Sequence, residues 1–434
     1  MTRSAGTTRR RAALYGGAAS LLILGYLYLV FFSSFDLPRP GIEDERDRSQ
    51  LLEEINTAIA NGVAFLESQQ SPDGAWRSQT YGFMKDGITL TPHVLSATVA
   101  LPESMTSEST ARGVDYLLAI DPDTAVLLQP VYTAAETSWV LRLAGHEQAA
   151  DPWLDLIEAH QLTEQLGWPR SDPRYGGWSY ATTPPVYHPD AVDPTRPDAN
   201  LSATVFAVGA LKLAGRLSDE QAAAARDFAF IVQALKLGGF WFSPTDPARN
   251  KAGRTKAILV DPTEHPATQP LLKMTPRPLP TQAARPPRGW HLPKYNPYGS
   301  ATADGVRVLL ACGVDQEIES LATARAWLVK YFDPSTVPGD FTPDREPLRH
   351  GYYHYYAWSV SHALRRLGVT HAGADRSTPW AEKLAAALIA TQDADGAWRN
   401  ASTDGKEDDP LVATPFALSA LAVCRNALME MPSE

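Results

Sequence analysis

Four aspartates are the residues of this 434-residue chain that could support acid chemistry: Asp198, Asp304, Asp408 and Asp409. Each stands at or near the start of an expected helix, where unpaired backbone N–H groups and the helix dipole meet whatever binds. Protonation of an alkene needs an unusually strong carboxylic acid, which a cluster of acids that tune one another can supply. We therefore take these four as the candidate catalytic residues.

The spacing around these acids is incomplete for two kinds of site. The run 198–201 reads Asp-Ala-Asn-Leu, which keeps a single acid where a proton-donating cluster would have several. The run 408–412 reads Asp-Asp-Pro-Leu-Val, so the third acid of an Asp-Asp-x-x-Asp magnesium site is missing. Two facing carboxylates for hydrolysis could be drawn from Glu136 and Asp198, but nothing in the sequence singles them out.

Aromatic side chains are the second chemical resource. The run 352–358 reads Tyr-Tyr-His-Tyr-Tyr-Ala-Trp, and one helix cannot turn all of these rings to the same side. Electron-rich rings stabilise carbocations and also bind apolar ligands, while core packing is the alternative for any single ring. A basic pair, Arg349 and His350, precedes the run and suits an anion. The candidate ligand-binding residues are Tyr132, Trp139, Phe206, His350, Tyr352, Tyr353, His354, Tyr356 and Trp358.

The elements that must position these residues are helices in pairs. Amphipathic stretches alternate with breaks marked by Gly and Pro, which predicts first helices at 53–69, 109–120, 152–166, 219–237, 316–332 and 379–391. Their partners are predicted at 91–101, 131–144, 198–214, 301–312, 352–367 and 411–424. The partners are the more apolar set, and a helix that is apolar most of the way round is buried on all sides. The fold expected is an all-α toroid of about six helix pairs, with the partners inside.

A short motif recurs between the helices of a pair. The pattern Gln-x-x-Asp-Gly-x-Trp occurs twice, at Gln70, Asp73, Gly74 and Trp76, and again at Gln392, Asp395, Gly396 and Trp398. Asp-Gly makes a tight turn in which Gly takes a positive φ, Gln can bridge helix ends, and Trp covers the turn. Shortened forms occur at 175–178 and 238–241.

This motif, followed by an inner helix, resembles the repeats of the squalene/oxidosqualene cyclase and protein-prenyltransferase β-subunit superfamily, over roughly residues 51–424. The resemblance implies a terpenoid-cyclase-like toroid and an apolar isoprenoid ligand. It also implies a zinc site in the prenyltransferases, made of an Asp, a Cys and a His. Here Asp304 and His354 match, but Val306 stands where the cysteine would be. We therefore expect no metal and no cofactor, with Asp304 and His354 as the only metal candidates, and a divergent member without the signature catalytic motifs.

The N-terminus predicts a membrane anchor. Residues 1–11 carry four arginines and no acid, and residues 12–32 carry no charge, which is roughly 31 Å of helix. The expected order is a basic cytoplasmic tail (1–11), a transmembrane helix (12–35), a linker (36–50) and an extracytoplasmic toroid (51–430). A cleaved signal peptide is the alternative, although its apolar region is usually shorter.

Composition excludes some classes and marks one insertion. A net charge of −10 argues against a nucleic-acid partner, and two cysteines cannot form a disulfide framework. Residues 244–297 hold 12 of the 35 prolines and carry nine basic against three acidic side chains. We expect this insertion to lie over the cavity mouth or on an anionic bilayer, with a solvated linker as the alternative.

Two functions fit these observations. The sequence favours a single-pass membrane protein whose toroid is non-catalytic or of unknown activity and binds a lipid or a protein partner. The alternative is an isoprenoid cyclase or transferase with a divergent active site. The oligomeric state is left open.

Overall fold

The computed structural model describes residues 48–102, 105, 108–188, 198–234, 237–255 and 294–431. The chain divides into two units, Met1–Gln50 and Leu51–Glu434, and the second contains almost all that is described. The predicted cytoplasmic tail, transmembrane helix and most of the linker lie outside the described residues, as do residues 256–293 of the Pro-rich insertion.

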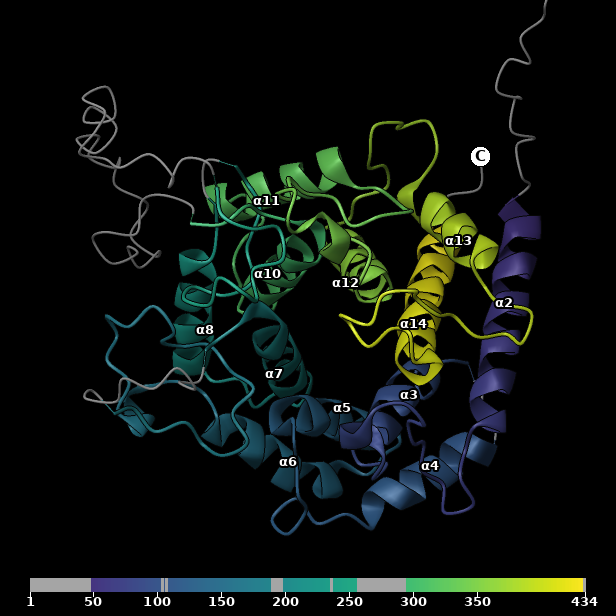
Figure 1. Cartoon of the computed structure of the whole chain (residues 1–434), viewed down its shortest axis with the longest axis horizontal. Coiled ribbons are helices and arrows are strands. Elements are labelled where there is room, and N and C mark those ends of the chain that lie inside the picture. The colour runs from purple at the N-terminus through teal and green to yellow at the C-terminus, as the bar shows by residue number, and fades with distance from the viewer. Residues whose placement is uncertain are drawn as a thin grey trace, which may run out of the picture. The chain divides into compact units, whose positions relative to one another are not determined.

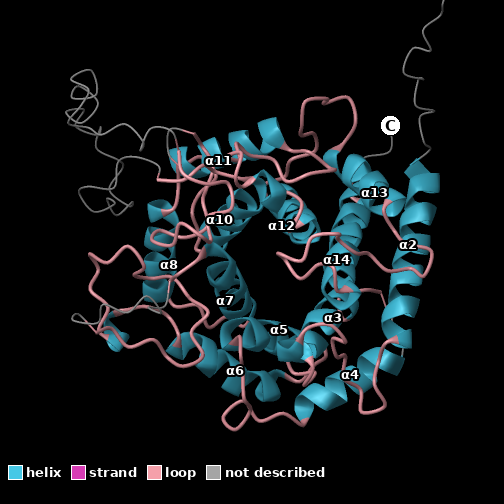
Figure 2. Cartoon of the chain, viewed as in Figure 1, coloured by secondary structure: helices cyan, strands magenta, loops and turns pink. Residues whose placement is uncertain are grey.

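Twelve α-helices in the described residues form six pairs, and these residues contain no β-strand (Figure 2). The outer helices are α2 (Arg48–Ser68), α4 (Glu108–Leu118), α6 (Glu147–Ala159), α8 (Asp219–Ile231), α11 (Glu319–Tyr331) and α13 (Trp380–Ala390). The inner helices are α3 (Leu90–Thr98), α5 (Pro130–Leu143), α7 (Leu201–Leu213), α10 (Gly299–Ala311), α12 (Tyr353–Arg366) and α14 (Pro410–Met429). Short 3₁₀ turns lie at Gly82–Met84, Glu164–Leu166 and Glu346–Leu348. The predicted all-α toroid is therefore confirmed.

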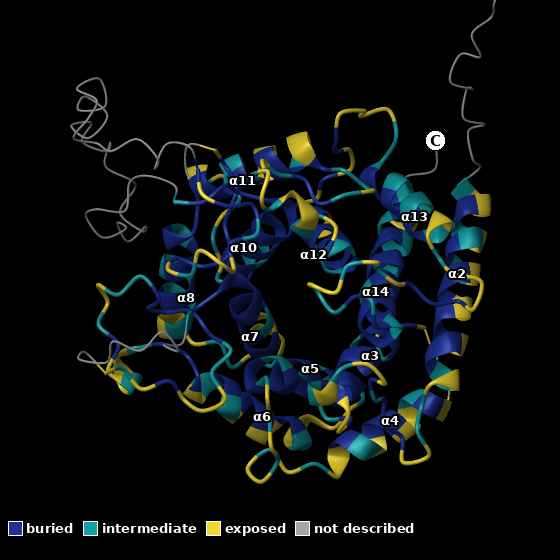
Figure 3. Cartoon of the chain, viewed as in Figure 1, coloured by how far each residue is buried: buried dark blue, intermediate teal, exposed yellow. Residues whose placement is uncertain are grey.

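The inner helices close into a ring (Figure 1). Contacts run from α3 to α5, α7, α10, α12 and α14 in turn, and α14 then contacts α3 again. The inner helices are buried over most of their surface, while the outer helices keep a solvent-facing side, as Figure 3 shows. The sequence already indicates this burial pattern, because most inner helices are more apolar than the outer helices with which they pair.

Some predicted boundaries are wrong. The fourth outer helix is predicted to end at 237 but ends at Ile231, and the last inner helix is predicted to end at 424 but runs to Met429. The third outer helix begins at Glu147 and ends at Ala159, whereas the sequence predicts 152–166 with Pro152 as a helix start. Pro152 instead lies inside α6, in its second turn. Gln161, which follows the helix, donates hydrogen bonds from its side chain to the carbonyls of Gly176 and Gln221.

The helix α14 is the described helix that is long and apolar enough to cross a bilayer, judged by length and composition. However, 67% of its most apolar window is buried inside the domain. It packs between α12 and α3 as part of the inner ring. Its apolar character is therefore that of a core helix.

Glutamine side chains join four of the six outer helices to the next one. The amide of Gln70, which follows α2, donates to the carbonyl of Gly74 in its own turn and to the carbonyl of Ser109 in α4. The same bridge to the next outer helix recurs three times: Gln161 to Gln221 in α8, Gln233 to Ser320 in α11, and Gln392 to Ala58 in α2. The last of these bridges joins the final repeat to the first.

Tryptophans of the motif tie the outer layer to the inner layer. The buried indole N–H of Trp76 donates to the carbonyl of Leu66 in α2, at 2.7 Å, and its backbone N–H donates to Thr91 Oγ1 in α3, at 3.0 Å. Trp398 repeats both bonds, to Leu388 in α13 and to Thr414 Oγ1 in α14. Each Trp thus fixes the loop that leads from an outer to an inner helix.

The motif glycine predicts a matched pair of substitutions. Gly396 has φ +88°, and an added Cβ would lie 2.4 Å from the backbone oxygen of Asn61 in α2. Gly145 has φ +84° but has nothing within 4 Å of the same position. Both substitutions by Ala incur the cost of a left-handed backbone, about 1 to 2 kcal/mol, but only Gly396→Ala also pushes two outer helices apart.

We expect Gly145→Ala to lower the free energy of unfolding by about 1 kcal/mol and Gly396→Ala by about 3 kcal/mol or more. Denaturant titration followed by circular dichroism measures both. Equal losses at the two glycines would contradict the role of Gly396 in helix-to-helix contact.

Candidate functional site

A cavity of about 590 Å³ lies inside the ring of inner helices. Every inner helix lines it with residues from its first two turns: His93, Tyr132, Ser202, Asp304, Tyr355 and Phe416 are one from each. The cavity is therefore at the N-terminal ends of the inner helices, where unpaired N–H groups and helix dipoles gather. This is the mouth at which the sequence places the candidate site.

Asp304 is the one of the four candidate acids that lines the cavity. Its side chain accepts hydrogen bonds from the hydroxyls of Tyr355, at 2.8 Å, and Ser359, at 2.5 Å, both on α12. The residue is 1% exposed. Burial raises the pKa of its carboxyl group, and the nearby Arg307 guanidinium opposes this only in part. The carboxyl group is thereby biased toward its protonated form.

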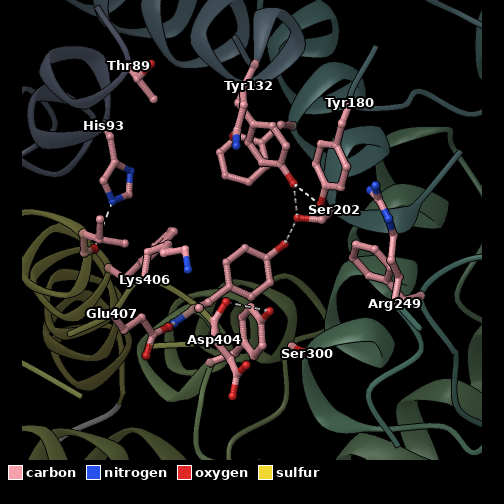
Figure 4. A pocket seen from close by; sticks show the side chains of 18 of the residues that line it. Thr89, His93, Tyr132, Tyr180, Ser202, Arg249, Ser300, Asp404, Lys406 and Glu407 are labelled. Carbon is pink, nitrogen blue, oxygen red and sulfur yellow. Dashed lines mark hydrogen bonds between the residues drawn. The ribbon is translucent and has the colours of Figure 1, made fainter. Parts of the chain in front are cut away.

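A chain of hydroxyl groups leads from Asp304 across the cavity wall. Tyr355 Oη, which donates to Asp304, lies 2.8 Å from Ser202 Oγ, and Ser202 Oγ accepts from Tyr132 Oη at 2.5 Å. Tyr180 Oη lies 3.3 Å from Tyr132 Oη. Figure 4 shows Tyr132, Tyr180 and Ser202 turned toward one another. Each hydroxyl group can donate to the next one toward Asp304, so this series of hydroxyl groups can pass a proton to the carboxyl group.

A buried ion pair lies on the other side of the ring. His93 Nδ1 lies 2.8 Å from Glu136 Oε1, and His93 Nε2 lies 3.0 Å from the carbonyl of Val412. A carbonyl can only accept, so Nε2 carries a proton. Burial works to lower the pKa of His93, but the Glu136 carboxylate and the carbonyl outweigh it and raise the pKa. Both members of the pair line the same cavity as Asp304, and α3 is three places from α10 in the six-helix ring.

Aromatic rings form much of the remaining wall. Phe206 and Phe416 line the cavity, and Trp358 packs behind them, with its ring centroid 5.1 Å from that of Phe206 and 5.5 Å from that of Phe416. Tyr132 and Tyr355 contact the same two phenylalanines, at 4.7 and 5.4 Å. The wall is therefore apolar and electron-rich, which suits an extended hydrocarbon or a carbocation.

Basic side chains line a third part of the cavity. Arg249 and Lys251 belong to the start of the Pro-rich insertion, and Arg345 and Lys406 come from two later loops. The described residues of the insertion thus border the cavity, one of the two placements expected for it. The Lys251 ammonium lies 3.0 Å from the centroid of the Tyr352 ring, and burial lowers its pKa to about 7.

The other three candidate acids do not line the cavity. Asp198 accepts hydrogen bonds from the hydroxyls of Ser243 and Thr245. Asp408 accepts from Tyr81 Oη at 2.6 Å. Asp409 is the N-cap of α14, where it accepts from the backbone N–H of Leu411, and it also accepts from Ser78.

Among the predicted ligand-binding residues, Tyr132, Phe206 and Tyr352 line the cavity, and Trp358 contacts its wall. Tyr353 and Tyr356 instead donate to the carbonyls of Pro334 and Asp333, in the loop after α11. His350 is exposed, and Trp139 is not part of the cavity lining.

His354 is paired with Glu407, whose carboxylate lies 3.0 Å from His354 Nδ1. Glu407 also accepts from the backbone N–H groups of His354 and Tyr355, so it caps α12. Asp304, the other metal candidate, has hydroxyl partners of its own. Within the described ranges, no three His, Cys, Asp or Glu side chains are grouped so that they could hold a metal ion.

Sequence reasoning missed several cavity residues, above all Ser202, Tyr180 and Lys251. Ser202 follows the N-cap Asn200 of α7 by two residues, which places it on the cavity side of the first turn. Tyr180 and Lys251 lie in loops, and their approach to the cavity depends on contacts between distant segments. The basic composition of the insertion was the available signal for Lys251.

The depressed pKa of Lys251 predicts a pH-dependent effect on stability. Its pKa is about 7 in the fold and about 10.4 in an unfolded chain, so the unfolded state binds more protons between these values. The charge therefore destabilises the fold fully below pH 7, and this cost fades as the pH rises toward 10. We expect Lys251→Met to raise the free energy of unfolding by about 1 kcal/mol or more at pH 6 and by less at pH 9.

Urea titration of the variant and the parent chain at the two pH values measures this difference. The exposed Lys330 on α11 provides the matched control, because Lys330→Met removes an ammonium that is not buried. A loss of stability in Lys251→Met at pH 6 would contradict the assignment.

The fold of this chain is similar to that of some proteins of known structure. No model of a known protein family matches the chain, and no curated protein matches it. Among solved structures, one similar to this chain is the type II terpene cyclase MstE from Scytonema, in a variant bound to the substrate geranylgeranyl dihydroxybenzoate. Its TM-score is 0.50 at 13% identity, over 87% of this chain and 99% of that chain. MstE without ligand has a TM-score of 0.47 at 12% identity, over 87% of this chain and 99% of its own. A protein from Actinoplanes has a TM-score of 0.44 at 15% identity, over 85% of this chain and 99% of its own. The likeness to the substrate-bound MstE shows that this chain has a terpenoid-cyclase-like fold.

Proposed function

We propose that this chain is an isoprenoid cyclase in which the carboxyl group of Asp304 starts the reaction by protonating an alkene. The observation that carries the proposal is that a buried carboxyl group, biased toward its protonated form, lines an aromatic cavity of about 590 Å³. Such a cavity holds a folded prenyl chain beside the proton donor. The substrate class is a linear prenyl compound and the product is a cyclised isomer.

Proton transfer requires an acid that is protonated at rest and stabilised once it is ionised. Burial raises the pKa of Asp304, which favours the first condition. Hydrogen bonds from Tyr355 and Ser359 supply the second, since both hydroxyls donate to the carboxylate that remains. Arg307 adds a positive charge: burial lowers its pKa to about 10, which leaves it cationic at neutral pH.

The carbon that accepts the proton forms a C–H bond and leaves a tertiary carbocation next to it. Neighbouring alkenes of the same chain attack this cation and form the ring C–C bonds, and loss of a proton ends the sequence. Rings of Phe206, Phe416 and Tyr355 can stabilise the positive charge as it moves along the wall. The Glu136 carboxylate, which is paired with His93, lines the same cavity as Asp304 and can take up the final proton.

The fold adds support, because MstE, the similar type II terpene cyclase, takes geranylgeranyl dihydroxybenzoate as substrate. The proposal departs from the Asp-x-Asp-Asp run of squalene cyclases, since the acid comes from α10 rather than from the run at residues 198–201. We thus place the chain as a divergent relative of that superfamily. The sequence alone favours a non-catalytic toroid that binds a lipid or a protein partner. This proposal instead prefers the enzyme, which was the alternative.

Replacement of the acid tests the proposal. Purified protein is incubated with geranylgeranyl dihydroxybenzoate, geranylgeranyl diphosphate and squalene in turn, and the products are identified by mass spectrometry. We expect a cyclised isomer from at least one substrate, and we expect Asp304→Asn to reduce its rate of formation by about 100-fold or more.

Asp315→Asn is the matched control, since Asp315 is exposed in the loop before α11 and its side chain accepts only from the backbone of its own turn. Binding of prenyl compounds without any product from the parent chain would favour the non-catalytic toroid. Activity retained in Asp304→Asn would assign the proton donor elsewhere.

A further inference from the structure

We infer that the basic end of the cavity binds an anionic head group, a carboxylate or a phosphate, at the end of the prenyl chain, through Arg249, Lys251 and Arg345. This inference rests on the proposed function and narrows its substrate class to anionic prenyl amphiphiles. A neutral hydrocarbon would leave Lys251 without an opposite charge among the described residues that pairs with it. The argument depends on how the three side chains are held, how their charges are balanced and where the apolar wall lies.

The loop that carries Arg249 and Lys251 is fixed by a buried asparagine. Asn250 is fully buried, and its side chain accepts from the backbone N–H groups of Phe242 and Ser243 and donates to the carbonyls of Ser243 and Asp246. All four bonds are to backbone groups of the same loop. The two basic residues on either side of Asn250 are therefore presented to the cavity from a defined position.

A second loop is tied to the first and brings Arg345. The backbone N–H of Thr342 donates to the carbonyl of Ala252, at 3.1 Å, and Arg345 Nη1 donates to the carbonyl of Ala248, at 3.2 Å. These bonds join segments almost 100 residues apart in the sequence. Three cations from two loops thus gather at one end of the cavity.

Acidic partners satisfy these cations only in part. Arg249 pairs with Asp246 and Arg345 with Asp344, in each case through Nε, and neither aspartate lines the cavity. Lys251 makes no hydrogen bond or ion pair with any residue that the structure describes, and its ammonium rests on the ring of Tyr352. A bound anion would supply the opposite charge that Lys251 does not find in this part of the chain.

Three carboxyl groups, those of Asp304, Glu407 and Asp404, attract the Lys251 ammonium, but they do not replace a bound anion. Both carboxyl oxygens of Asp304 accept hydrogen bonds from α12, and burial raises the pKa of this group. Glu407 is engaged by His354 and the start of α12. Asp404 also lines the cavity, from an exposed loop, where it accepts from Ser402. Burial is accordingly the largest influence on Lys251 and lowers its pKa to about 7, ahead of the attraction of these three carboxyl groups.

The apolar wall extends from this basic end into the ring. Tyr352 is beneath Lys251, and Tyr180 is beneath the Arg249 guanidinium at 4.8 Å. Tyr132 stacks on Tyr180, and Phe206 follows Tyr132 toward the ring interior. A ligand with its anion at the loops would therefore extend its prenyl chain along these rings to Asp304. Head and tail are recognised by different surfaces of one cavity.

Equilibrium binding separates the two surfaces. Three probes share one prenyl chain: geranylgeranyl diphosphate, geranylgeranyl dihydroxybenzoate and the neutral geranylgeraniol. Their affinities for the purified full chain are measured by quenching of tryptophan fluorescence at low salt and at 0.5 M salt. We expect at least one anion to bind about 10-fold or more tightly than the alcohol, with an advantage that shrinks at high salt. Which anion binds more tightly identifies the head group as carboxylate or phosphate.

Variants assign the effect to the named side chains. Lys251→Met and Arg249→Gln should each lower the affinity for the preferred anion about 10-fold and leave that of geranylgeraniol unchanged. Unchanged binding of the alcohol shows that each variant is folded. Lys330→Met, which removes a distant surface charge, should change neither affinity.

Two results would overturn the inference: equal affinity for the alcohol and both anions, or anion affinity that survives both Lys251→Met and Arg249→Gln. In either case the apolar cavity and the proposed cyclisation would stand. Failure of all three probes to bind would instead contradict the proposed function itself, and the inference with it.

Discussion

Closure of the inner ring between α14 and α3 is the constraint on which the rest of this structure depends. The contacts across this seam join residues more than 300 positions apart in the chain. His93 on α3 lies against the carbonyl of Val412 on α14, Ser78 donates to Asp409, and Gln392 donates to the carbonyl of Ala58. Without these contacts the six helix pairs would be an open arc, and their N-terminal ends would not enclose a cavity. Asp409 lies at this seam. The sequence suggests it for catalysis, but in the structure it caps α14 and accepts a hydrogen bond from Ser78.

The sequence predicted the architecture well because the architecture is periodic. Most inner helices are more apolar than the outer helices with which they pair, and this difference is visible in the sequence. The motif at Gln70 and Gln392 was also visible, since its four positions lie within seven residues. Gln161 and Gln233 make the same bridge to the next outer helix but escaped notice. In the first of them, 15 residues separate the glutamine from the glycine that accepts its second bond, so no fixed spacing marks it.

The site was harder to predict than the fold. Four acids fitted the sequence criterion of standing near a helix start, and three of them turn out to accept hydrogen bonds from a neighbouring loop or from their own helix. Asp304 differs because its partners, Tyr355 and Ser359, come from an adjacent inner helix and hold it at the cavity. The position of Lys251 was equally hard to predict from the sequence, because its place beside Tyr352 is set by hydrogen bonds between segments about 100 residues apart. Contacts of this range leave no local pattern.

The closed ring also has a consequence for how the cavity comes into being. Contacts between residues distant in sequence form late in folding, because the entropy of closing the long intervening chain is lost before any contact energy is gained. The seam joins residues more than 300 positions apart, and the cavity wall includes residues on both sides of it, His93 and Phe416 among them. The cavity wall is therefore complete only when the ring is closed. A chain without the last helix pair would lack Val412 and Phe416, and with them the part of the wall that they form.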